Sequence, residues 1–208
     1  MAVTWGVASG RAAAQGPPRK IGPYAIDIHA TVPRFPADDK VLADSRGLAQ
    51  AELPSTGLGI HATATVYPLT WKALTFGLGA DVTLARAHSS EKLITRTTMG
   101  RAVTERFSHF APELSFNFGT GDGWSYLSGG IGPAVWSVVP DGTPDAAADT
   151  ERLQTINYGG GARWFLNDHV AFSLDVRFYA INPGTPVQGR PGGPRKTLVF
   201  MGGGVSLR

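Results

Sequence analysis

Strict alternation of apolar and polar residues over Val170–Asn182 (VAFSLDVRFYAIN) is the feature that most limits how this chain can fold. Every second residue from Val170 to Ala180 is apolar, whereas the intervening positions include Asp175 and Arg177. A period of two residues places the two sets on opposite faces of a β-strand. A strand that crosses a bilayer needs about 9–11 tilted residues. The stretch therefore predicts a strand of membrane-crossing length with one apolar and one polar face.

Seven further stretches repeat this alternation along the chain. They are Tyr24–Val32, Leu58–Pro68, Leu74–Ala85, Ser108–Phe118, Trp124–Val139, Leu153–Phe165 and Thr197–Arg208. The connections between the stretches alternate between long and short, as in a meander whose two ends differ. A weak helical pattern over Val41–Leu53 is interrupted by Gly47, and no 3.6-residue period persists. The sequence predicts an all-β fold, an eight-stranded antiparallel up-and-down barrel.

The composition excludes several classes of function. The 208 residues contain no cysteine, which excludes disulfides, thiolate metal sites and a cysteine nucleophile. The net charge is only +3 and is evenly spread, so we expect no nucleic-acid partner. No run of about 18 apolar residues is present, so no transmembrane helix is expected.

The polar faces distinguish a membrane barrel from a soluble one. In a soluble ligand-binding barrel, which is the alternative, the polar set would face water and usually carry many lysines and glutamates. Here the polar sets are rich in Gly, Ser and Thr and contain no lysine in mid-strand, and the apolar sets are almost free of charge. These faces favour a transmembrane barrel with its apolar side in lipid and its polar side in a narrow lumen.

Aromatic residues cluster near the short connections, where an interfacial girdle of a membrane barrel would lie. The residues expected to form this girdle are Trp71, Phe118, Trp124, Tyr126, Trp164 and Phe165.

Four segments carry a resemblance to a known family. They are APELSFNF at Ala111–Phe118, YLSGGIGPAVW at Tyr126–Trp136, YGGGARWFL at Tyr158–Leu166 with Val170–Tyr179 after it, and the glycine-rich last strand. Residues 21–208 resemble the small outer-membrane protein β-barrels, the eight-stranded class that includes the barrel domain of OmpA. The resemblance implies an outer-membrane location, short periplasmic turns, long external loops and a monomer. It also implies outer-membrane lipid, lipopolysaccharide and the barrel assembly machinery as partners.

The first residues have a different composition. Ala12–Ala14 resembles a signal-peptidase site, so residues 1–20 are interpreted as a signal-peptide remnant and leader, and residues 21–208 as the barrel domain.

The inward faces gather charged side chains that would be retained in a narrow lumen only if they were paired. The predicted lumen charge network consists of Asp27, His29, His61, Asp81, His109, Glu113, Arg163, Asp175, Arg177 and Arg208. We expect Asp175 and Arg177 to have Arg163 and Arg208 as neighbours. Glu113 is a candidate partner for an arginine across the interior. A gated ion path through this network is the alternative to a structural plug.

Catalytic and metal sites are weakly indicated. Ser108, His109 and Glu113 could suggest a hydrolase, but His109 belongs to the inward set and no G-x-S-x-G motif is present. His29, His61 and His109 together with Asp27 could bind zinc by residue type, and the first two lie on neighbouring strands, but unrelated lumen residues fit this pattern equally well. We expect no enzyme activity, no metal and no cofactor.

The predicted function is that of a non-enzymatic structural or interaction scaffold in the outer membrane, with a largely filled polar lumen. A narrow, low-conductance porin-like channel is the first alternative and a soluble ligand-binding barrel the second. Arg190, Arg195 and Lys196 in the last loop form a solvated basic face or, alternatively, contact lipopolysaccharide phosphates.

Overall fold

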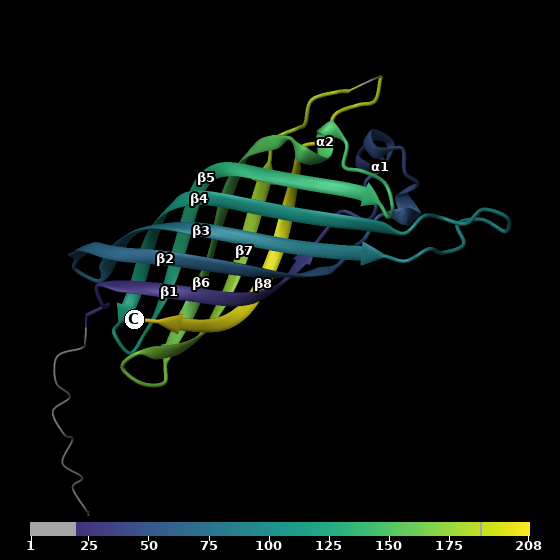
Figure 1. The fold of residues 1–208 in the computed structure, drawn as a ribbon. Helices are drawn as coiled ribbons and strands as arrows, with labels where there is room; N and C mark the ends of the chain where they lie inside the picture. The colour runs from purple at the N-terminus through teal and green to yellow at the C-terminus, as the bar shows by residue number, and fades with distance from the viewer. Residues whose placement is uncertain (1–19, 188) are drawn as a thin grey trace, which may run out of the picture.

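The protein is one closed barrel of eight antiparallel strands, in which each strand pairs with the next along the chain and β1 pairs with β8 (Figure 1). The computed structural model describes residues 20–187 and 189–208. The strands are β1 (Tyr24–Arg34), β2 (Gly57–Trp71), β3 (Leu74–Ser89), β4 (Val103–Thr120), β5 (Gly123–Pro140), β6 (Arg152–Phe165), β7 (Val170–Ile181) and β8 (Lys196–Leu207). The predicted fold class is confirmed, including the up-and-down order of the strands. Residues 1–19 lie outside the described residues, so the interpretation of residues 1–20 as a signal-peptide remnant and leader stays a prediction.

The connections give the barrel two unlike ends. Short turns after β2, β4 and β6 lie at one end, together with the C-terminus, and we call this the short-turn end (Figure 1). Long connections after β1, β3, β5 and β7 lie at the other, the long-loop end. The long connections carry the helices α1 (Lys40–Arg46) and α2 (Ala147–Thr150) and the 3-10 turn η1 (Gln50–Glu52). None of the helices in the described chain has the length and apolar composition that a membrane crossing requires.

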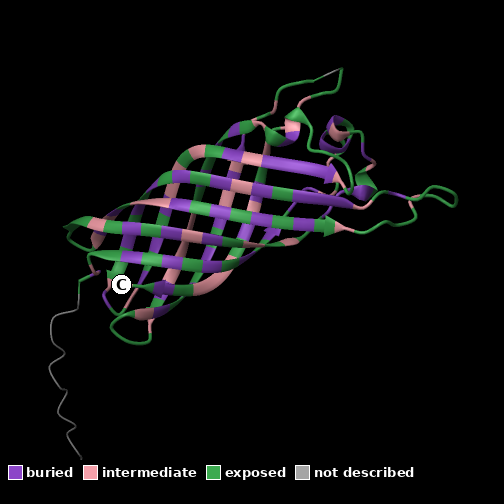
Figure 2. Cartoon of the chain, viewed as in Figure 1, coloured by how far each residue is buried: buried purple, intermediate pink, exposed green. Residues whose placement is uncertain are grey.

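Exposed and buried residues alternate along the strands, as the banded colouring shows (Figure 2), and the exposed set is largely apolar whereas the buried set is largely polar. Leu114 on the outside of β4 is 57% exposed, whereas Asp175 and Arg177 on the inside of β7 are 3% and 1% exposed. A soluble barrel would have the reverse arrangement, because its apolar set fills the interior. The outside therefore presents an apolar belt suited to lipid, as the alternation predicts.

At the long-loop end, β3 and β4 run four or five residues beyond the predicted strands Leu74–Ala85 and Ser108–Phe118. The inward residues of these extensions include both apolar and polar side chains. Ala87, Val103 and Phe107 belong to one buried apolar cluster. The connection between β3 and β4 is therefore shorter than the predicted one, residues 86–107. The strands continue past the apolar belt, and their ends pack around residues of the loops.

The apolar belt leads to a prediction about Leu114. An arginine on the lipid face near the middle of a membrane barrel costs about 2–4 kcal/mol. We expect Leu114→Arg to lower the free energy of unfolding in lipid vesicles by this amount, measured by equilibrium denaturation. The control is Leu166→Arg in the short turn after β6, where Leu166 is 77% exposed, and a change within about 0.5 kcal/mol is expected. Equal losses in the two variants would contradict an outward lipid belt.

Candidate functional site

The lumen of the barrel is the candidate site, and an ion pair between opposite sides of the wall lies at its centre. Arg163 on β6 donates from Nε to Asp27 Oδ1 at 2.8 Å and from Nη2 to Oδ2 at 2.6 Å. Thr63 donates to Asp27 Oδ2 at 2.6 Å, and the Ser206 hydroxyl donates to Oδ1. The pair is bidentate, which is the strongest geometry for a guanidinium and a carboxylate. It ties β1 to β6 through the interior.

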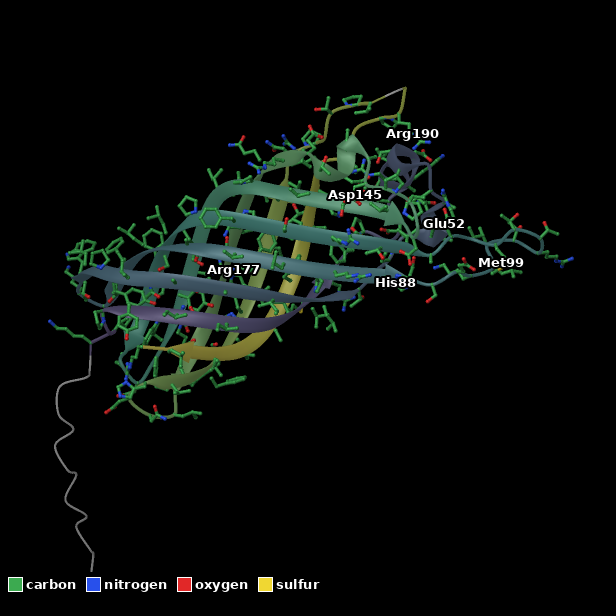
Figure 3. All side chains as sticks on the ribbon, viewed as in Figure 1. Glu52, His88, Met99, Asp145, Arg177 and Arg190 are labelled. Atoms are coloured by element: carbon green, nitrogen blue, oxygen red, sulfur yellow. The ribbon has the colours of Figure 1, made fainter. Side chains whose placement is uncertain are left out.

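A second charged group crosses the lumen from β7 to β4. Arg177 donates from Nη1 and Nη2 to the two oxygens of Glu113, at 2.8 and 3.2 Å, and from Nε to Asp175 Oδ1 at 3.1 Å. The Tyr126 hydroxyl donates to Asp175 Oδ2 at 2.6 Å. One guanidinium therefore faces two carboxylates, and Figure 3 shows Arg177 within the barrel rather than at either mouth.

Three histidines and Asp81 lie in the same central part of the lumen. Together with the two arginine groups described above, they form what we call the charged layer. His61 Nε2 and His109 Nδ1 lie 3.2 and 3.0 Å from the two oxygens of Asp81. His29 stacks on His61 with ring centroids 5.6 Å apart, and its Nε2 lies 2.7 Å from the hydroxyl of Ser173. No group of three or more His, Cys, Asp or Glu residues in the described chain is arranged to hold a metal ion.

Nine of the ten residues predicted for the lumen network are buried inside the barrel, and Arg208 is the exception. Arg208 lies at the short-turn end, where its guanidinium carbon is 3.9 Å from the centre of the Phe165 ring and Nε donates to Asp168 O at 2.8 Å. It is therefore not a partner of Asp175. Arg163 pairs with Asp27 on the far wall, whereas Glu113 pairs with Arg177 across the interior.

Three of the six aromatic residues assigned to the girdle face outward, namely Trp71, Phe118 and Trp164. The assignment of Trp124 and Tyr126 to the girdle is wrong, because both are inside the barrel, at 3% and 4% exposure.

Trp124 and Tyr126 face inward because both rings contact the guanidinium of Arg163. The guanidinium carbon lies 4.0 Å from the Tyr126 ring centre and 5.5 Å from that of Trp124. A cation and an aromatic face attract each other more strongly when both are out of water. Phe165 is half-buried and stacks on Trp124 at 4.9 Å, so it also belongs to the interior.

The long-loop mouth is closed by the segment that follows β1, which we call the cap (residues 35–53). Leu42 and Ala43 of α1 are fully buried in an apolar cluster that lines the mouth. The other members of this cluster are Phe35, Leu48, Leu53, Ala85, Ala87, Val103, Phe107, Ala134, Trp136, Val138, Leu153, Tyr179, Ile181, Leu198 and Phe200. The interior is therefore mainly apolar at the long-loop end, where the buried carboxylate of Glu105 accepts a hydrogen bond from Trp136 Nε1 at 2.6 Å, and charged in the middle.

Ion pairs hold the cap to the strands and to the other loops. Asp39 caps α1 by accepting from the Leu42 N–H at 3.0 Å, and it also binds Lys196 Nζ of β8 at 2.8 Å. Arg46 at the end of α1 donates from Nε to Asp149 of α2 at 2.9 Å. Gly47, with φ of 63°, then ends the helix in the left-handed conformation that glycine adopts most readily.

Glu52 connects the cap with the connection that follows β3. Its carboxylate accepts from the Arg101 N–H at 2.7 Å, from Arg101 Nε at 3.1 Å and from the Ala49 N–H at 2.6 Å. Burial by itself would raise the pKa of Glu52, but these hydrogen bonds and the charge of Arg101 outweigh burial and lower the pKa to about 2. The ionised form of Glu52 is therefore the one that the folded cap stabilises.

The cross-lumen pair gives a prediction about coupling. Removing one partner of a buried ion pair typically costs about 3–5 kcal/mol, because the other charge remains buried without compensation. We expect Arg163→Met to destabilise the protein by about this amount and the double variant Asp27→Asn/Arg163→Met to recover part of the loss. The measurement is a double-mutant cycle of unfolding free energies in vesicles. Additive losses in the cycle would show that the two groups act independently.

Glu52 gives a prediction about pH. A carboxyl group with a lowered pKa in the folded state stabilises that state above its unfolded pKa, near 4.5, and this contribution is lost as the pH falls towards 2. We expect the hydrogen-exchange protection factors of the α1 amides, which correct for the intrinsic effect of pH, to fall over this range while those of the belt strands are unchanged. Glu52→Gln should already show fast exchange in α1 at neutral pH. The proposed anchoring is refuted if α1 exchanges equally slowly in both proteins at pH 7.

No protein-family model matches the chain, and no curated protein matches it. Among solved structures, the Neisserial surface protein A (NspA) is similar over 89% of this chain and 97% of its own, with 12% identity and a TM-score of 0.56. The outer membrane protein OprG from Pseudomonas aeruginosa is similar over 91% of this chain and 97% of its own, with 13% identity and a TM-score of 0.50. At this identity the likeness concerns the fold. By its closed eight-stranded architecture and its apolar outer belt, the chain has the fold of the small outer-membrane β-barrels, and the outer membrane is the location that this fold indicates.

Proposed function

We propose that the protein is a non-conducting, non-enzymatic scaffold of the outer membrane, which anchors its long loops at the membrane surface. The observation that carries this proposal is the filling of the lumen by two different seals in series. The charged layer buries Arg163, Arg177 and their carboxylate partners at 7% exposure or less, and the cap covers the mouth above it. An ion that entered the lumen would have to break both.

The charged layer supports this proposal through its pairing. An ion path needs sites that bind weakly enough to release the ion. Here Glu113 and Asp175 are both held by Arg177, and Asp27 accepts four hydrogen bonds from Arg163, Thr63 and Ser206. Carboxylates that are already neutralised by fixed guanidinium groups offer little attraction to a passing cation.

The absence of a catalytic arrangement at the residues that suggested one also supports the proposal. Ser108 lies on the outward set of β4, whereas His109 points inward and lies 3.0 Å from Asp81. Glu113 is occupied by Arg177. A nucleophile needs its base within hydrogen-bond reach and a third group that orients the base. Neighbouring residues on opposite faces of a strand do not meet this requirement.

The long loops offer a surface for contacts beyond the membrane. The connection of residues 90–102 projects well past the end of the barrel, and Met99 lies on this projection (Figure 3). A β-bridge between Leu93 and Met99 holds its two arms together, and these side chains are 65% and 56% exposed. Large apolar side chains held at an exposed tip are typical of contact surfaces.

Planar-bilayer recording tests the proposal. We expect the full chain to insert and to give no discrete current steps over a wide range of voltage. A variant in which a short Gly-Ser linker replaces residues 35–53 removes the cap and should also stay silent, because the charged layer remains. Adding Glu113→Ala and Arg177→Ala to the cap deletion weakens the second seal, and openings are expected only then. Steps in the wild-type protein would instead favour the narrow-channel alternative.

A further inference from the structure

A groove on the outer wall of the barrel lies between the apolar belt and the long loops. It has a volume of about 800 Å³. The outward side chains Leu58 and Ile60 of β2 and Leu84 of β3 form part of its apolar floor, and all three are more than half exposed. Asp149 and Thr150 of α2 line its edge on the long-loop side. The groove therefore has one side continuous with the lipid belt and one side formed by a loop.

Three arginines line the same groove at the edge of the belt nearest the long-loop end. Arg86 is the next outward residue after Leu84 on β3, Arg106 lies on β4, and Arg152 begins β6. All three belong to the outward sets of their strands and are exposed. Their height, just beyond the last apolar side chains, is that of lipid head groups in a membrane barrel.

The pairing of the strands places two of these positive charges directly opposite each other. Arg86 and Arg106 are partners across β3 and β4. Like charges opposite one another on a sheet are destabilising unless an anion lies between them.

The carboxylates of the groove do not neutralise this charge. Asp145 lies 3.9 Å from Arg106 with both side chains about half exposed, so the pair is loose, and Figure 3 shows Asp145 at the loop side of β5. Asp149 is engaged by Arg46 at 2.9 Å. Within the described chain, Arg86 and Arg152 have no carboxylate at ion-pair distance. The groove thus retains positive charge beside an apolar floor.

We propose that this groove binds the phosphorylated head group of an outer-leaflet lipid, the lipid A part of lipopolysaccharide, with the phosphate between Arg86 and Arg106. The acyl chains would lie along Leu58, Ile60 and Leu84. Arginine binds phosphate through two parallel donors, and an opposed pair of guanidinium groups can hold one phosphate from both sides. The inference rests on the proposed function, since the lipid is present only if the barrel is in the outer membrane with its long loops outside.

These arginines are not the basic residues that the sequence suggested for this role. Lys196 is paired with Asp39 at 2.8 Å, and the guanidinium of Arg190 lies over Gly47 in the cap region. Arg86, Arg106 and Arg152 lie just outside the predicted strands, in predicted connections, so their outward position beside the belt becomes apparent only from the observed register.

Native mass spectrometry of the detergent-solubilised full chain tests the proposal with diphosphoryl lipid A as the probe. We expect the double variant Arg86→Gln/Arg106→Gln to bind it at least about tenfold more weakly than the wild type, since hydrogen bonds to charged groups are among the stronger ones. The matched control is Arg34→Gln, an outward arginine at the same end of β1 that does not line the groove, and its affinity should be unchanged. Heat-modifiable gel mobility verifies that each variant is folded.

Two further arms separate a lipid site from a simple anion site. Lipid A without phosphates, but with the same acyl chains, should bind as weakly to the wild type as the intact lipid binds to the double variant. Inorganic phosphate in large excess should not displace the intact lipid, because it has no acyl chains to occupy the floor. Equal binding by the double variant and Arg34→Gln, or full displacement by inorganic phosphate, overturns the proposal. If the protein inserts into bilayers and yet shows no such preference, this inference fails while the scaffold function stands.

Discussion

Closure of the backbone hydrogen-bond ladder is the constraint on which the rest of this structure depends. Lipid offers no partner to an N–H or a carbonyl group, so a sheet inside a bilayer must pair its first strand with its last. Here β1 pairs with β8 from Ile26 opposite Leu207 to Arg34 opposite Val199. Closing the sheet with its apolar face outward forces the polar face into an interior that eight strands leave only wide enough for side chains. The charged lumen is thus a consequence of closure.

Inside that interior, each charge needs a partner because burial without one is costly. Arg177 is matched by Glu113 and Asp175, and Arg163 by Asp27. These contacts join β7 to β4 and β6 to β1, strands that are not neighbours in the sheet. The network therefore braces the barrel across its width, in directions that the backbone ladder does not cover. The same contacts fill the space through which an ion would pass, so bracing and sealing have one physical origin.

The sequence predicted the strands well because lipid and lumen impose opposite demands on neighbouring residues, as at Glu113 and Leu114. It could not predict which charges pair, because the partner of Arg163 depends on the stagger of the strands and on distances across the closed barrel. The same information was missing for Trp124 and Tyr126, which lie near a short turn but face inward to cover Arg163. Proximity to a turn indicates depth in the membrane, whereas the side of the wall follows from the pairing register.

The cap gave only a weak signal in the sequence, the helical pattern over Val41–Leu53, which the structure resolves into α1 and η1 on either side of Gly47. Helix α1 has only seven residues, so its apolar positions span fewer than two complete turns and a 3.6-residue period is weak. Its local signals, Asp39 before the helix and Gly47 after it, are common in loops as well. What stabilises α1 is tertiary, because Leu42 is buried among side chains of the strands, such as Phe107 of β4 and Phe200 of β8.

The arginines of the lumen and those of the outer surface lie in different environments. The inward residues Arg163 and Arg177 are buried and held by carboxylates at 2.6–3.2 Å, as buried charges require. The outward residues Arg86 and Arg106 are exposed beyond the belt, and of the two only Arg106 has a carboxylate nearby in the described chain, that of Asp145 at 3.9 Å. Both inner guanidinium groups are neutralised by carboxylates in direct contact, whereas the two outer guanidinium groups face each other with only one loosely placed carboxylate nearby. The unbalanced charge is at the height of lipid head groups, and an anion from the membrane is the partner that would balance it.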